Sequence, residues 1–318
     1  MTLALAQLDT ITNDYIAPRI ADNVYGAVPL LHRLKARNQV ILSGGIDIRE
    51  PLLYAKSGKA TGFDGNGPLG TTMPSVITGA EFDWVTYESP VAIARRDEKM
   101  NGGAEGVIKL LENLRKVAEM DLMDRVGADL FTGNESASST KELDGLQLMV
   151  DDDDTPKAYG GILTTDMATW TADDTALSAA LSLFAMQQAY GRATRGSDHP
   201  SLVVCTQAEF DKYWSLLQAD QRFNDDKMAS AGFQALRFNG IPVVVDPNCP
   251  SASSTSQTMY FLNEKYLFWY AHKDVNVIAR PFQEPENLWV ASSNLLWMCQ
   301  VVTNHRRAHA RLTAVDPS

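Results

Sequence analysis

The stretch that decides the fold reads GGIDIREPLLY at residues 44–54, VITGAEFDWVTYESPVAIA at residues 76–94 and AEGVIKLLENLRKVAEMDLMDRVGADLF at residues 104–131. The first two segments contain many β-branched and aromatic residues, and Phe82 and Trp84 alternate with acidic residues. This period of two predicts a pair of β-strands. The two strands would form a long ribbon that leads directly into a long helix.

The tip of this ribbon is unusually wide. It spans residues 55–75 and contains five glycines, namely Gly58, Gly62, Gly65, Gly67 and Gly70. Most hairpin loops are much shorter. A two-stranded ribbon buries too little surface to be stable alone in water. We therefore expect the ribbon to lie on another surface, and a second copy of the chain is a reasonable candidate.

Residues 104–131 are expected to form one amphipathic helix. Apolar residues recur every three or four positions, at Val107, Leu111, Leu114, Ala118, Leu122, Val126 and Leu130. Opposite charges spaced i,i+4 on the other face contribute only ~0.2–0.5 kcal/mol per pair, whereas each buried Leu or Val contributes roughly 1.5–3 kcal/mol. Burial of the apolar stripe therefore decides the stability of the helix. Gly133 and Asn134 mark its end.

The composition is that of an ordinary soluble globular protein. The chain has 318 residues, of which 45% are hydrophobic and 21% are charged, enough for one large domain or two smaller ones. The net charge of −11 argues against a general phosphate-binding surface, which needs a basic field. No apolar run approaches the ~18 residues of a membrane span. Residues 1–8 lack the basic flank of a secretory signal.

The three cysteines, Cys205, Cys249 and Cys299, are far apart in the sequence. An odd number of cysteines without metal-ligand spacing predicts reduced, buried thiols in a cytosolic setting. Cys205 and Cys299 also lie in apolar runs.

Two regions flank the ribbon and helix. Residues 1–43 carry apolar groups at roughly helical spacing, interrupted by Pro18 and Pro29, and this arm packs either along its own domain or onto a neighbour. From about Glu135 short strands and helices alternate. Expected features there are a helical face at residues 177–184, a strand at 202–205, a capping box at Thr206 and Glu209, a hairpin at Asn239-Gly240 and strands at 259–262 and 266–270.

Two local motifs carry weak chemical signals. Residues 65–70 match G-x-G-x-x-G, but Pro68, Pro74 and a strand pattern follow instead of a helix. A flexible tip is therefore favoured over a dinucleotide site. Residues 151–154 are four consecutive aspartates without EF-hand spacing. They are expected to form a solvated loop, with a cation site as the alternative.

The late histidines are the other candidate ligands. His305 and His309 are four residues apart, but a zinc site needs further ligands. Arg306, Arg307 and Arg311 interleave with them, which favours a basic, solvated strand or tail. The sequence contains no Gly-x-Ser-x-Gly elbow and no Cys–His signature. We therefore predict no catalytic residue, no cofactor and no metal, while a triad assembled in space stays open.

The order of these parts resembles a known family. An arm, a long ribbon, a long helix, an α+β insertion and a terminal strand follow one another as in the major capsid proteins of tailed bacteriophages with the Hong Kong 97-type coat fold. The similar local strings are residues 159–162 with Trp170, 238–247, 260–263 and 303–307. Each string is weak by itself, and their order carries the resemblance over nearly the whole chain.

The resemblance implies an α+β fold divided as in that family. The expected parts are an N-terminal arm (1–43), an E-loop β-ribbon (44–94), a P-domain with a long spine helix (95–134 and 281–318) and an A-domain (135–280). No long scaffold-like segment precedes the arm, as it does in some members. This implies a separate scaffolding protein, no scaffold, or a precursor that is already trimmed.

The resemblance also implies a structural function without enzymatic activity. Copies of the chain would form the hexamers and pentamers of an icosahedral phage head that encloses double-stranded DNA without sequence-specific binding. Portal and scaffolding proteins are further expected partners, a decoration protein is optional, and no membrane is expected. The expected location is the virion, assembled in the cytoplasm of a bacterial host.

Subunit contacts are expected from the ribbon, from the polar loop 222–232 near a ring axis, and from the late basic cluster. The candidate contact residues are Lys56, Lys59, Phe63, Gly65, Gly67, Trp84, Arg222, Asp225, Asp226, Arg306 and Arg307. Lysines on an exposed tip are normally solubilising, and salt bridges between subunits are the alternative for Lys56 and Lys59. The Lys–Asn crosslink of the family's founding member is not transferred.

Two other functions stay open. An encapsulin-like nanocompartment shell would have the same fold and would enclose a cargo enzyme instead of DNA; neighbouring genes would separate the two. A hydrolase with a spatially assembled site would be a monomer or small oligomer with a deep polar pocket. The missing catalytic motifs disfavour the hydrolase.

Overall fold

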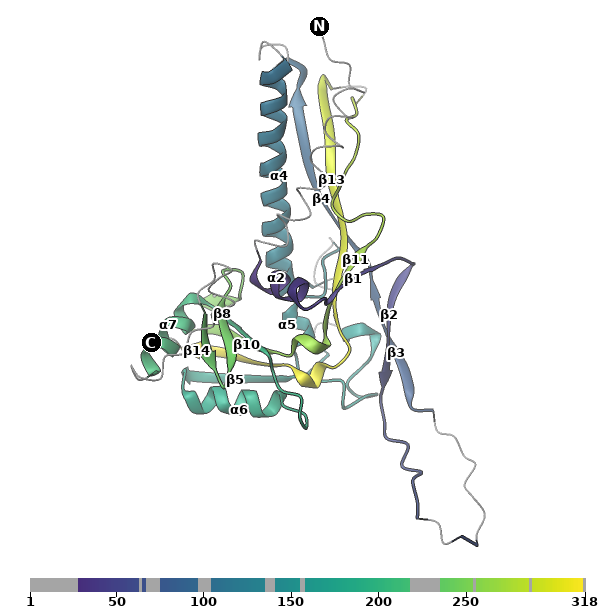
Figure 1. Ribbon diagram of the computed structural model, residues 1–318, viewed down its shortest axis with the longest axis vertical. Helices are drawn as coiled ribbons and strands as arrows, with labels where there is room; N and C mark the ends of the chain where they lie inside the picture. The colour runs from purple at the N-terminus through teal and green to yellow at the C-terminus, as the bar shows by residue number, and fades with distance from the viewer. Residues whose placement is uncertain are drawn as a thin grey trace.

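The computed structural model describes residues 28–62, 65–66, 75–96, 104–134, 141–154, 158–217, 235–253, 256–285 and 288–316. These residues form an elongated, branched molecule (Figure 1). The long helix α4 (Ala104–Thr132) runs beside two long strands, β4 (Val85–Ala94) and β13 (Val290–Thr303). A second sheet lies to one side, and the ribbon of β2 (Asp47–Leu53) and β3 (Ile77–Asp83) projects away from both.

Strand β13 is the centre of the first sheet. It pairs antiparallel with β4 over ten residues of register, from Val290–Ala94 to Cys299–Val85. It also pairs antiparallel with β11 and β12, and β1 adds a parallel strand beside β11. The bounds of these strands are Val40–Ser43 for β1, Leu267–His272 for β11 and Ile278–Ala279 for β12.

Helix α4 begins at Ala104, as predicted, and ends at Thr132. Its inward stripe, Ala118, Leu122, Val126 and Leu130, is at most 3% exposed. This stripe joins the main core together with residues of β4 and β13. Burial of the apolar stripe therefore fixes the helix on the first sheet.

The end of α4 is tied to strand β4. The hydroxyl of Tyr87 donates a hydrogen bond to Asp129 Oδ2 at 2.9 Å and accepts one from the backbone of Leu143 at 3.1 Å. The backbone N–H of Gly133 donates to the carbonyl of Asp129 at 2.7 Å. A Cβ on Gly133 would lie 2.4 Å from the Leu143 carbonyl oxygen. Only glycine therefore fits where the chain leaves the helix.

The second sheet has the strand order β5-β14-β10-β6-β8-β7, with β9 paired to β10. Strands β14 and β5 are parallel, as are β6 and β8, while the other pairs are antiparallel. The bounds are Asp173–Ala180 for β5, Leu202–Cys205 for β6, Ala235–Phe238 for β7, Ile241–Val245 for β8, Ser251–Ser253 for β9, Ser256–Leu262 for β10 and Ala310–Asp316 for β14.

Helices α6 (Leu183–Ala193) and α7 (Gln207–Leu216) cover this sheet and form a second core with it. Short helices complete the described chain at α2 (Pro29–Ala36), α5 (Leu146–Met149), η1 (Tyr159–Gly161), η3 (Glu264–Tyr266) and η4 (Arg306–Ala308).

The chain passes from one sheet to the other at positions that differ from the domain boundaries expected from the sequence. Strands β11 and β12, expected in the A-domain, belong to the first sheet, and β14, expected in the P-domain, belongs to the second. The reason lies in two short connections. Helical turn η3 joins β10 to β11, and η4 joins β13 to β14. Each turn carries the chain from one sheet into the other.

Residues 28–43 of the predicted arm pack along their own domain. Pro29 begins helix α2 instead of interrupting a helix, because proline fits the first turn. Leu30, Leu31 and Leu34 are fully buried. Residues 1–27, the remainder of the arm, lie outside the described residues.

Several local predictions in the second half are confirmed. Asn239 and Gly240 have φ of 49° and 81° and form the turn between β7 and β8. Thr206 caps α7 by accepting a hydrogen bond from the backbone of Glu209 at 3.5 Å.

The helical face predicted at residues 177–184 is wrong, because residues up to Ala180 pair with β14 as strand β5. Helix α6 begins only after its N-cap, Ser182.

The three cysteines are free and buried, as predicted. Burial raises the pKa of each thiol well above its ordinary value, which keeps the thiols protonated. In the described part of the chain, no helix has the length and apolar character that crossing a membrane requires.

Candidate assembly surfaces

The predicted return strand of the ribbon is in fact two strands. β3 pairs with β2 over its whole length, whereas β4 leaves the ribbon and pairs with β13. The break falls at Trp84, where the buried face changes from even positions such as Phe82 to odd positions such as Val85. Trp84 is half-buried, and its ring lies edge-on against His272 at 5.3 Å between centroids. This predicted contact residue therefore already packs within its own subunit.

The inner face of the ribbon packs on its own chain. Ile48, Leu52 and Phe82 are at most 4% exposed. The Phe82 ring lies 4.9 Å from the ring of Tyr159. Gly160 has φ of +63°, and a Cβ there would lie 2.8 Å from the Cβ of Ala80. Glycine thus allows η1 to approach the ribbon closely and support its root.

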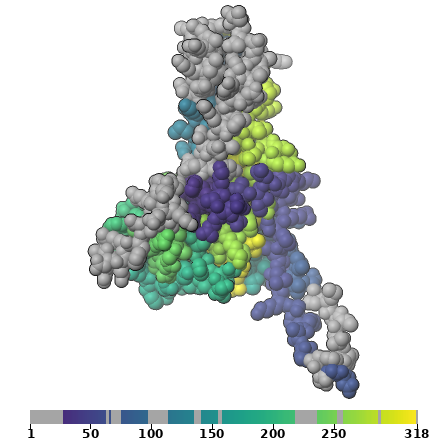
Figure 2. Space-filling view, in the orientation of Figure 1, coloured from purple at the N-terminus to yellow at the C-terminus, as the bar shows by residue number. Residues whose placement is uncertain are grey.

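The outer face of the ribbon has no such support in the described chain. Leu53 and Ile77, which are register partners, are each 68% exposed, and Ile46, in the bend just before β2, is 91% exposed. Between these apolar ends, Arg49 Nη2 lies 3.2 Å from Glu81 Oε1. Figure 2 shows that the end of the ribbon beyond β2 extends away from the rest of the molecule. An exposed apolar face on a projecting element is typical of a protein–protein contact.

The structure describes only some of the contact residues predicted at the ribbon tip. Lys56, Lys59 and Gly65 are exposed. Gly65 has φ of +90°, a conformation that favours glycine. Phe63 and Gly67 lie outside the described residues, as does the rest of the tip from residue 67 to residue 74.

The predicted ring-axis residues, Arg222, Asp225 and Asp226, lie outside the described residues, within the undescribed stretch 218–234. The helices of the second sheet expose apolar side chains of their own. Phe184 of α6 is 72% exposed and Trp214 of α7 is 40% exposed. Neither residue was among the contact residues predicted from the sequence, which placed Phe184 on a helical face.

Further exposed apolar side chains lie along the first sheet. On α4 these are Val117 and Met120, which are 54% and 63% exposed, and beside the start of β13 Leu288 and Trp289 are 62% and 67% exposed. Apolar surface is thus distributed over the ribbon, the long helix and both sheets. Such a distribution fits contacts with several neighbours better than a single binding site.

The prediction of a solvated basic tail is wrong for Arg306. Arg306 is 1% exposed. Its guanidinium donates to the carbonyl oxygens of Met149 (2.9 Å), Trp170 (2.7 Å), Leu148 (3.2 Å) and Asp151 (2.9 Å). Burial lowers the pKa of Arg306. The side chain thus organises the chain around α5 and has no surface left for a neighbouring subunit.

The other members of this cluster are also structural. His309 is fully buried, where its Nδ1 accepts a hydrogen bond from the backbone of Asn263 at 3.2 Å. Burial lowers the pKa of His309 to about 3, with His305 and Arg306 adding to the shift. Arg307 is half-buried and lines a pocket beside the ribbon. Of the two contact residues predicted in this cluster, Arg306 and Arg307, Arg307 alone keeps the exposure that a contact residue needs.

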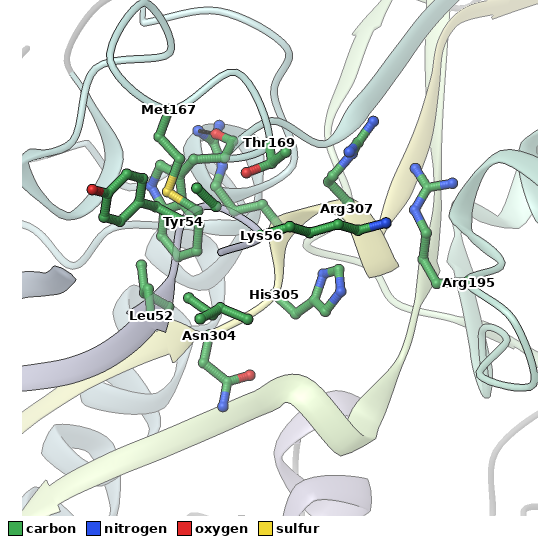
Figure 3. A pocket seen from close by; sticks show the side chains of 13 residues that line it. Leu52, Tyr54, Lys56, Met167, Thr169, Arg195, Asn304, His305 and Arg307 are labelled. Atoms are coloured by element: carbon green, nitrogen blue, oxygen red, sulfur yellow. Dashed lines mark hydrogen bonds between the residues drawn. The ribbon is translucent and has the colours of Figure 1, made fainter. Parts of the chain in front are cut away.

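A pocket with basic side chains lies beside the ribbon. It has a volume of about 300 Å³ and is lined by the ribbon root (Leu52 to Lys56), by Met167, Thr169 and Trp170, by Arg195, and by the turn from Asn304 to Arg307. Figure 3 shows Lys56, Arg195, His305 and Arg307 pointing toward a common space. We call it the basic pocket.

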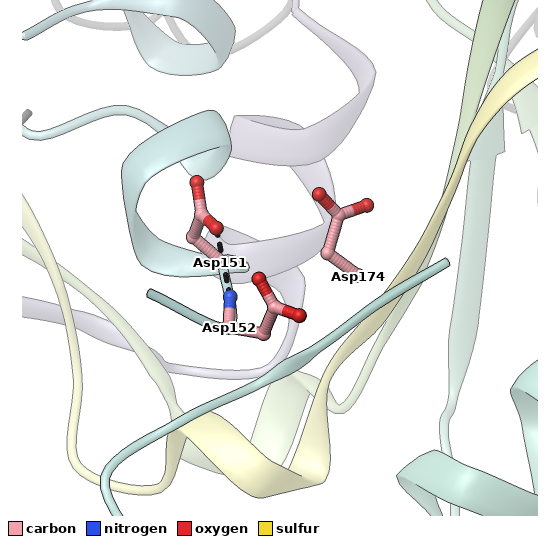
Figure 4. Close-up of side chains that lie close together, drawn as sticks. All are labelled: Asp151, Asp152 and Asp174. Carbon is pink, nitrogen blue, oxygen red and sulfur yellow. Dashed lines mark hydrogen bonds between the residues drawn. The ribbon is translucent and has the colours of Figure 1, made fainter. Parts of the chain in front are cut away.

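The aspartate run contributes to an acidic cluster. Asp151, Asp152 and Asp174 bring their carboxylates within 4.8 Å of one another (Figure 4). Arg311 Nη2 lies 3.1 Å from Asp151 Oδ2 and 2.6 Å from Asp174 Oδ2. An arginine thus already occupies the position between two of the carboxylates. The cluster is explained as an ion-pair network that ties β14 to β5.

A buried carboxyl in the second core makes stability depend on pH. Glu209 is fully buried, and burial raises its pKa to about 8, while the backbone amide of Thr206 counteracts the rise. The folded state therefore holds a proton that the unfolded state loses above its ordinary pKa of 4.5. Stability contributed by this group is present at low pH and is lost as pH rises through about 8.

We expect Glu209→Gln to remove this loss. Relative to the wild type, the variant should gain a few kcal/mol of unfolding free energy as pH rises from 4.5 to 8. Urea unfolding across that pH range measures the gain. Asp211→Asn, an exposed carboxylate on the same helix, controls for the change in net charge. A constant difference between Glu209→Gln and the wild type at all pH values would contradict the prediction.

Comparison with known proteins places the fold. No family model and no curated protein matches the sequence. Among solved structures, the chain is similar to the capsid asymmetric unit of cyanophage A-1(L), with a TM-score of 0.64, 18% identity and coverage of 87% of this chain and 90% of that chain. It is also similar to the capsid of a native GTA particle, with a TM-score of 0.59, 13% identity and 89% of each chain covered.

A bacterial shell has the same architecture. The holo-SrpI encapsulin complex of Synechococcus elongatus aligns with a TM-score of 0.58 and 13% identity, over 90% of this chain and 88% of that chain. The chain therefore has the α+β Hong Kong 97-type coat fold, found in phage capsids and encapsulin shells.

Proposed function

We propose that the chain is a coat subunit that assembles with copies of itself into the shell of a tailed-phage head around double-stranded DNA. The ribbon carries this proposal, because it exposes Leu53 and Ile77 on its outer face and Ile46 just before β2. The solved structures with this fold are those of shells. Burying each of these side chains against a neighbour would contribute roughly 1.5–3 kcal/mol. The role is structural, since the neighbours are shell proteins and not enzymes.

We also propose how the subunits are arranged in the shell and which other proteins join it. The ribbon lies across a neighbouring subunit, and the loop 222–232 approaches the axis of a hexamer or pentamer. Portal and scaffolding proteins, and optionally a decoration protein, join the shell in the cytoplasm of a bacterial host. A net charge of −11 suits a DNA container, because packaged DNA then slides along the wall instead of binding to it.

A cargo-enclosing nanocompartment is the second candidate. The encapsulin complex aligns nearly as well as the phage capsids, with a TM-score of 0.58 against 0.64. Both candidates predict closed shells. They differ in content: shells from the native source would contain double-stranded DNA in the first case and a protein cargo in the second.

Shell formation is directly testable. We expect purified recombinant protein to form closed shells, tubes or hexameric rings in negative-stain electron micrographs, with matching light scattering from the same sample. Protein in about 6 M urea is the unassembled control, since denaturant removes the folded subunit. A small oligomer that persists with the cognate scaffolding protein, at high protein concentration and at raised salt, would contradict the proposed function.

A further inference from the structure

The basic pocket collects positive charge from segments distant in the sequence. Lys56 comes from the ribbon root, Arg195 follows α6, and Arg307 lies in η4. Their side chains converge beside His305 (Figure 3). The fold therefore builds this concentration of charge, which no local sequence pattern contains.

The positive charge of the pocket is only partly compensated within the described chain. No carboxylate there forms an ion pair with Lys56, Arg195 or Arg307. Asp173 acts on Arg195 from a distance and counteracts the lowering of its pKa, but Asp173 is already paired with Arg192 at 3.4 Å. The nearby acid, Asp198, is already bonded to Lys265 at 3.0 Å and to the Tyr266 hydroxyl. The pKa of Arg195 is lowered first by burial and second by the positive charge of Arg307. The two arginines therefore repel each other. An anion in the pocket would relieve this repulsion.

The walls of the pocket indicate the kind of anion. Leu53 is 68% exposed and Tyr54 is 37% exposed, and both line the pocket beside Met167. A protein segment would bury these side chains while it presents a charged group. Duplex phosphates would stay hydrated and leave the apolar wall in water. A volume of about 300 Å³ suits one or two side chains better than a double helix.

We propose that the basic pocket binds an aspartate or glutamate carboxylate from a second copy of this chain. The inference rests on the proposed function, because it places an intersubunit contact at the root of the ribbon. The chain supplies suitable groups, with 39 acidic residues against 28 lysines and arginines. Arginine holds carboxylates through paired N–H donors, and lysine adds a point charge.

Zero-length crosslinking tests the contact on the wild-type sequence. A carbodiimide activates a carboxylate, and the Lys56 amine then displaces the activating group to form an amide, so only groups within ion-pair distance react. Particles assembled from a mixture of ¹⁴N and ¹⁵N subunits should give Lys56-containing peptides linked to acidic peptides of the other isotope. Unassembled subunits serve as the control and should give none.

Charge reversal tests the contribution of the pocket to assembly. The double variant Arg195→Glu/Arg307→Glu should raise the critical concentration for assembly about tenfold or more, because a repulsive pair replaces an attractive one. The double variant Lys273→Glu/Lys35→Glu makes a matched change in net charge at two exposed positions outside the pocket, and Lys273→Glu alone, on the turn after β11, makes half of that change. They should assemble nearly as the wild type does. Thermal unfolding of the isolated subunits checks that each variant is folded.

The outcomes separate this inference from the proposed function. If wild-type protein forms no shell under any condition, the proposed function fails, and the inference fails with it. If shells form but no mixed-isotope crosslink involves Lys56 and the pocket variant assembles normally, only the pocket inference is wrong. If the pocket variant assembles normally but retains less DNA, the pocket binds phosphate, which also overturns the carboxylate proposal.

Discussion

Replacing Arg306 by methionine is expected to destabilise the folded subunit by about 3–5 kcal/mol, because removing one partner of a buried charged network leaves the others unpaired. The guanidinium donates to four backbone carbonyls. Methionine fills similar space but donates nothing, so the carbonyls of Leu148, Met149 and Trp170 would lose the hydrogen bonds that Arg306 donates. The carbonyl of Asp151 would keep the hydrogen bond from the backbone N–H of Ala172 at 2.9 Å. Urea unfolding of the unassembled subunit measures the loss.

The neighbouring arginine provides a matched control for Arg306. Arg307 is half-buried and forms no ion pair in the described chain, so Arg307→Met should change the unfolding free energy by about 1 kcal/mol or less. Arg306→Lys should fall between the wild type and Arg306→Met, because one ammonium group cannot reach all four carbonyls. Equal stability of Arg306→Met and Arg307→Met would show that the buried network contributes little.

Deleting residues 62–70 from the ribbon tip is expected to leave a folded subunit that does not assemble. Of the deleted stretch, the structure describes Gly62, Gly65 and Asn66, which are exposed, and nothing lies within 4 Å of a Cβ built on Gly62 or Gly65. Their removal therefore takes no side chain from the core. If the tip and the outer face of the ribbon contact a neighbour, the critical concentration for assembly should rise about 100-fold or more. This rise corresponds to a loss of about 2.7 kcal/mol of association free energy per subunit. Light scattering against protein concentration measures this change.

Two controls make the deletion interpretable. The deletion variant should unfold at the same urea concentration as the wild type, which shows that the subunit remains folded. A variant with residues 62–70 replaced by nine glycines and serines keeps the length of the tip and separates chain length from side-chain contacts. If the deletion variant formed normal shells, the ribbon would not be needed to join subunits, and the prediction would be wrong.

The division of the ribbon shows where sequence reasoning stopped. Alternation predicted strands on both sides of the tip, and β2, β3 and β4 are indeed strands. The buried positions shift from Phe82 to Val85 across Trp84, a one-residue change of face that reverses which side of a strand is buried. The shift is visible in the sequence. Its meaning, a transfer from the ribbon to β13, needs the partner strand.

The late basic cluster shows a second limit. Arg306, His309 and Arg311 read as a solvated tail because charged and imidazole groups usually face water. In the folded chain they are at most 6% exposed. Their partners, including Leu148, Met149 and Asp151, lie more than 150 residues away in the sequence. No local pattern reports that a distant segment will supply carbonyls and carboxylates.

The sequence by itself determined the local elements and their order. Helix α4, the turn at Asn239-Gly240, the cap at Thr206 and the buried cysteines depend on side chains and backbone conformations within a few positions, where spacing is informative. The order of arm, ribbon, helix and insertion was sufficient to indicate the coat fold.

Only the tertiary structure decided the pairing of β4 with β13, the place of β14 in the second sheet, the burial of Arg306 and the convergence of Lys56, Arg195 and Arg307. Each of these features joins segments that are far apart in the chain. Their contacts depend on how the sheets assemble around two cores, and burial free energy summed over the whole subunit selects that arrangement.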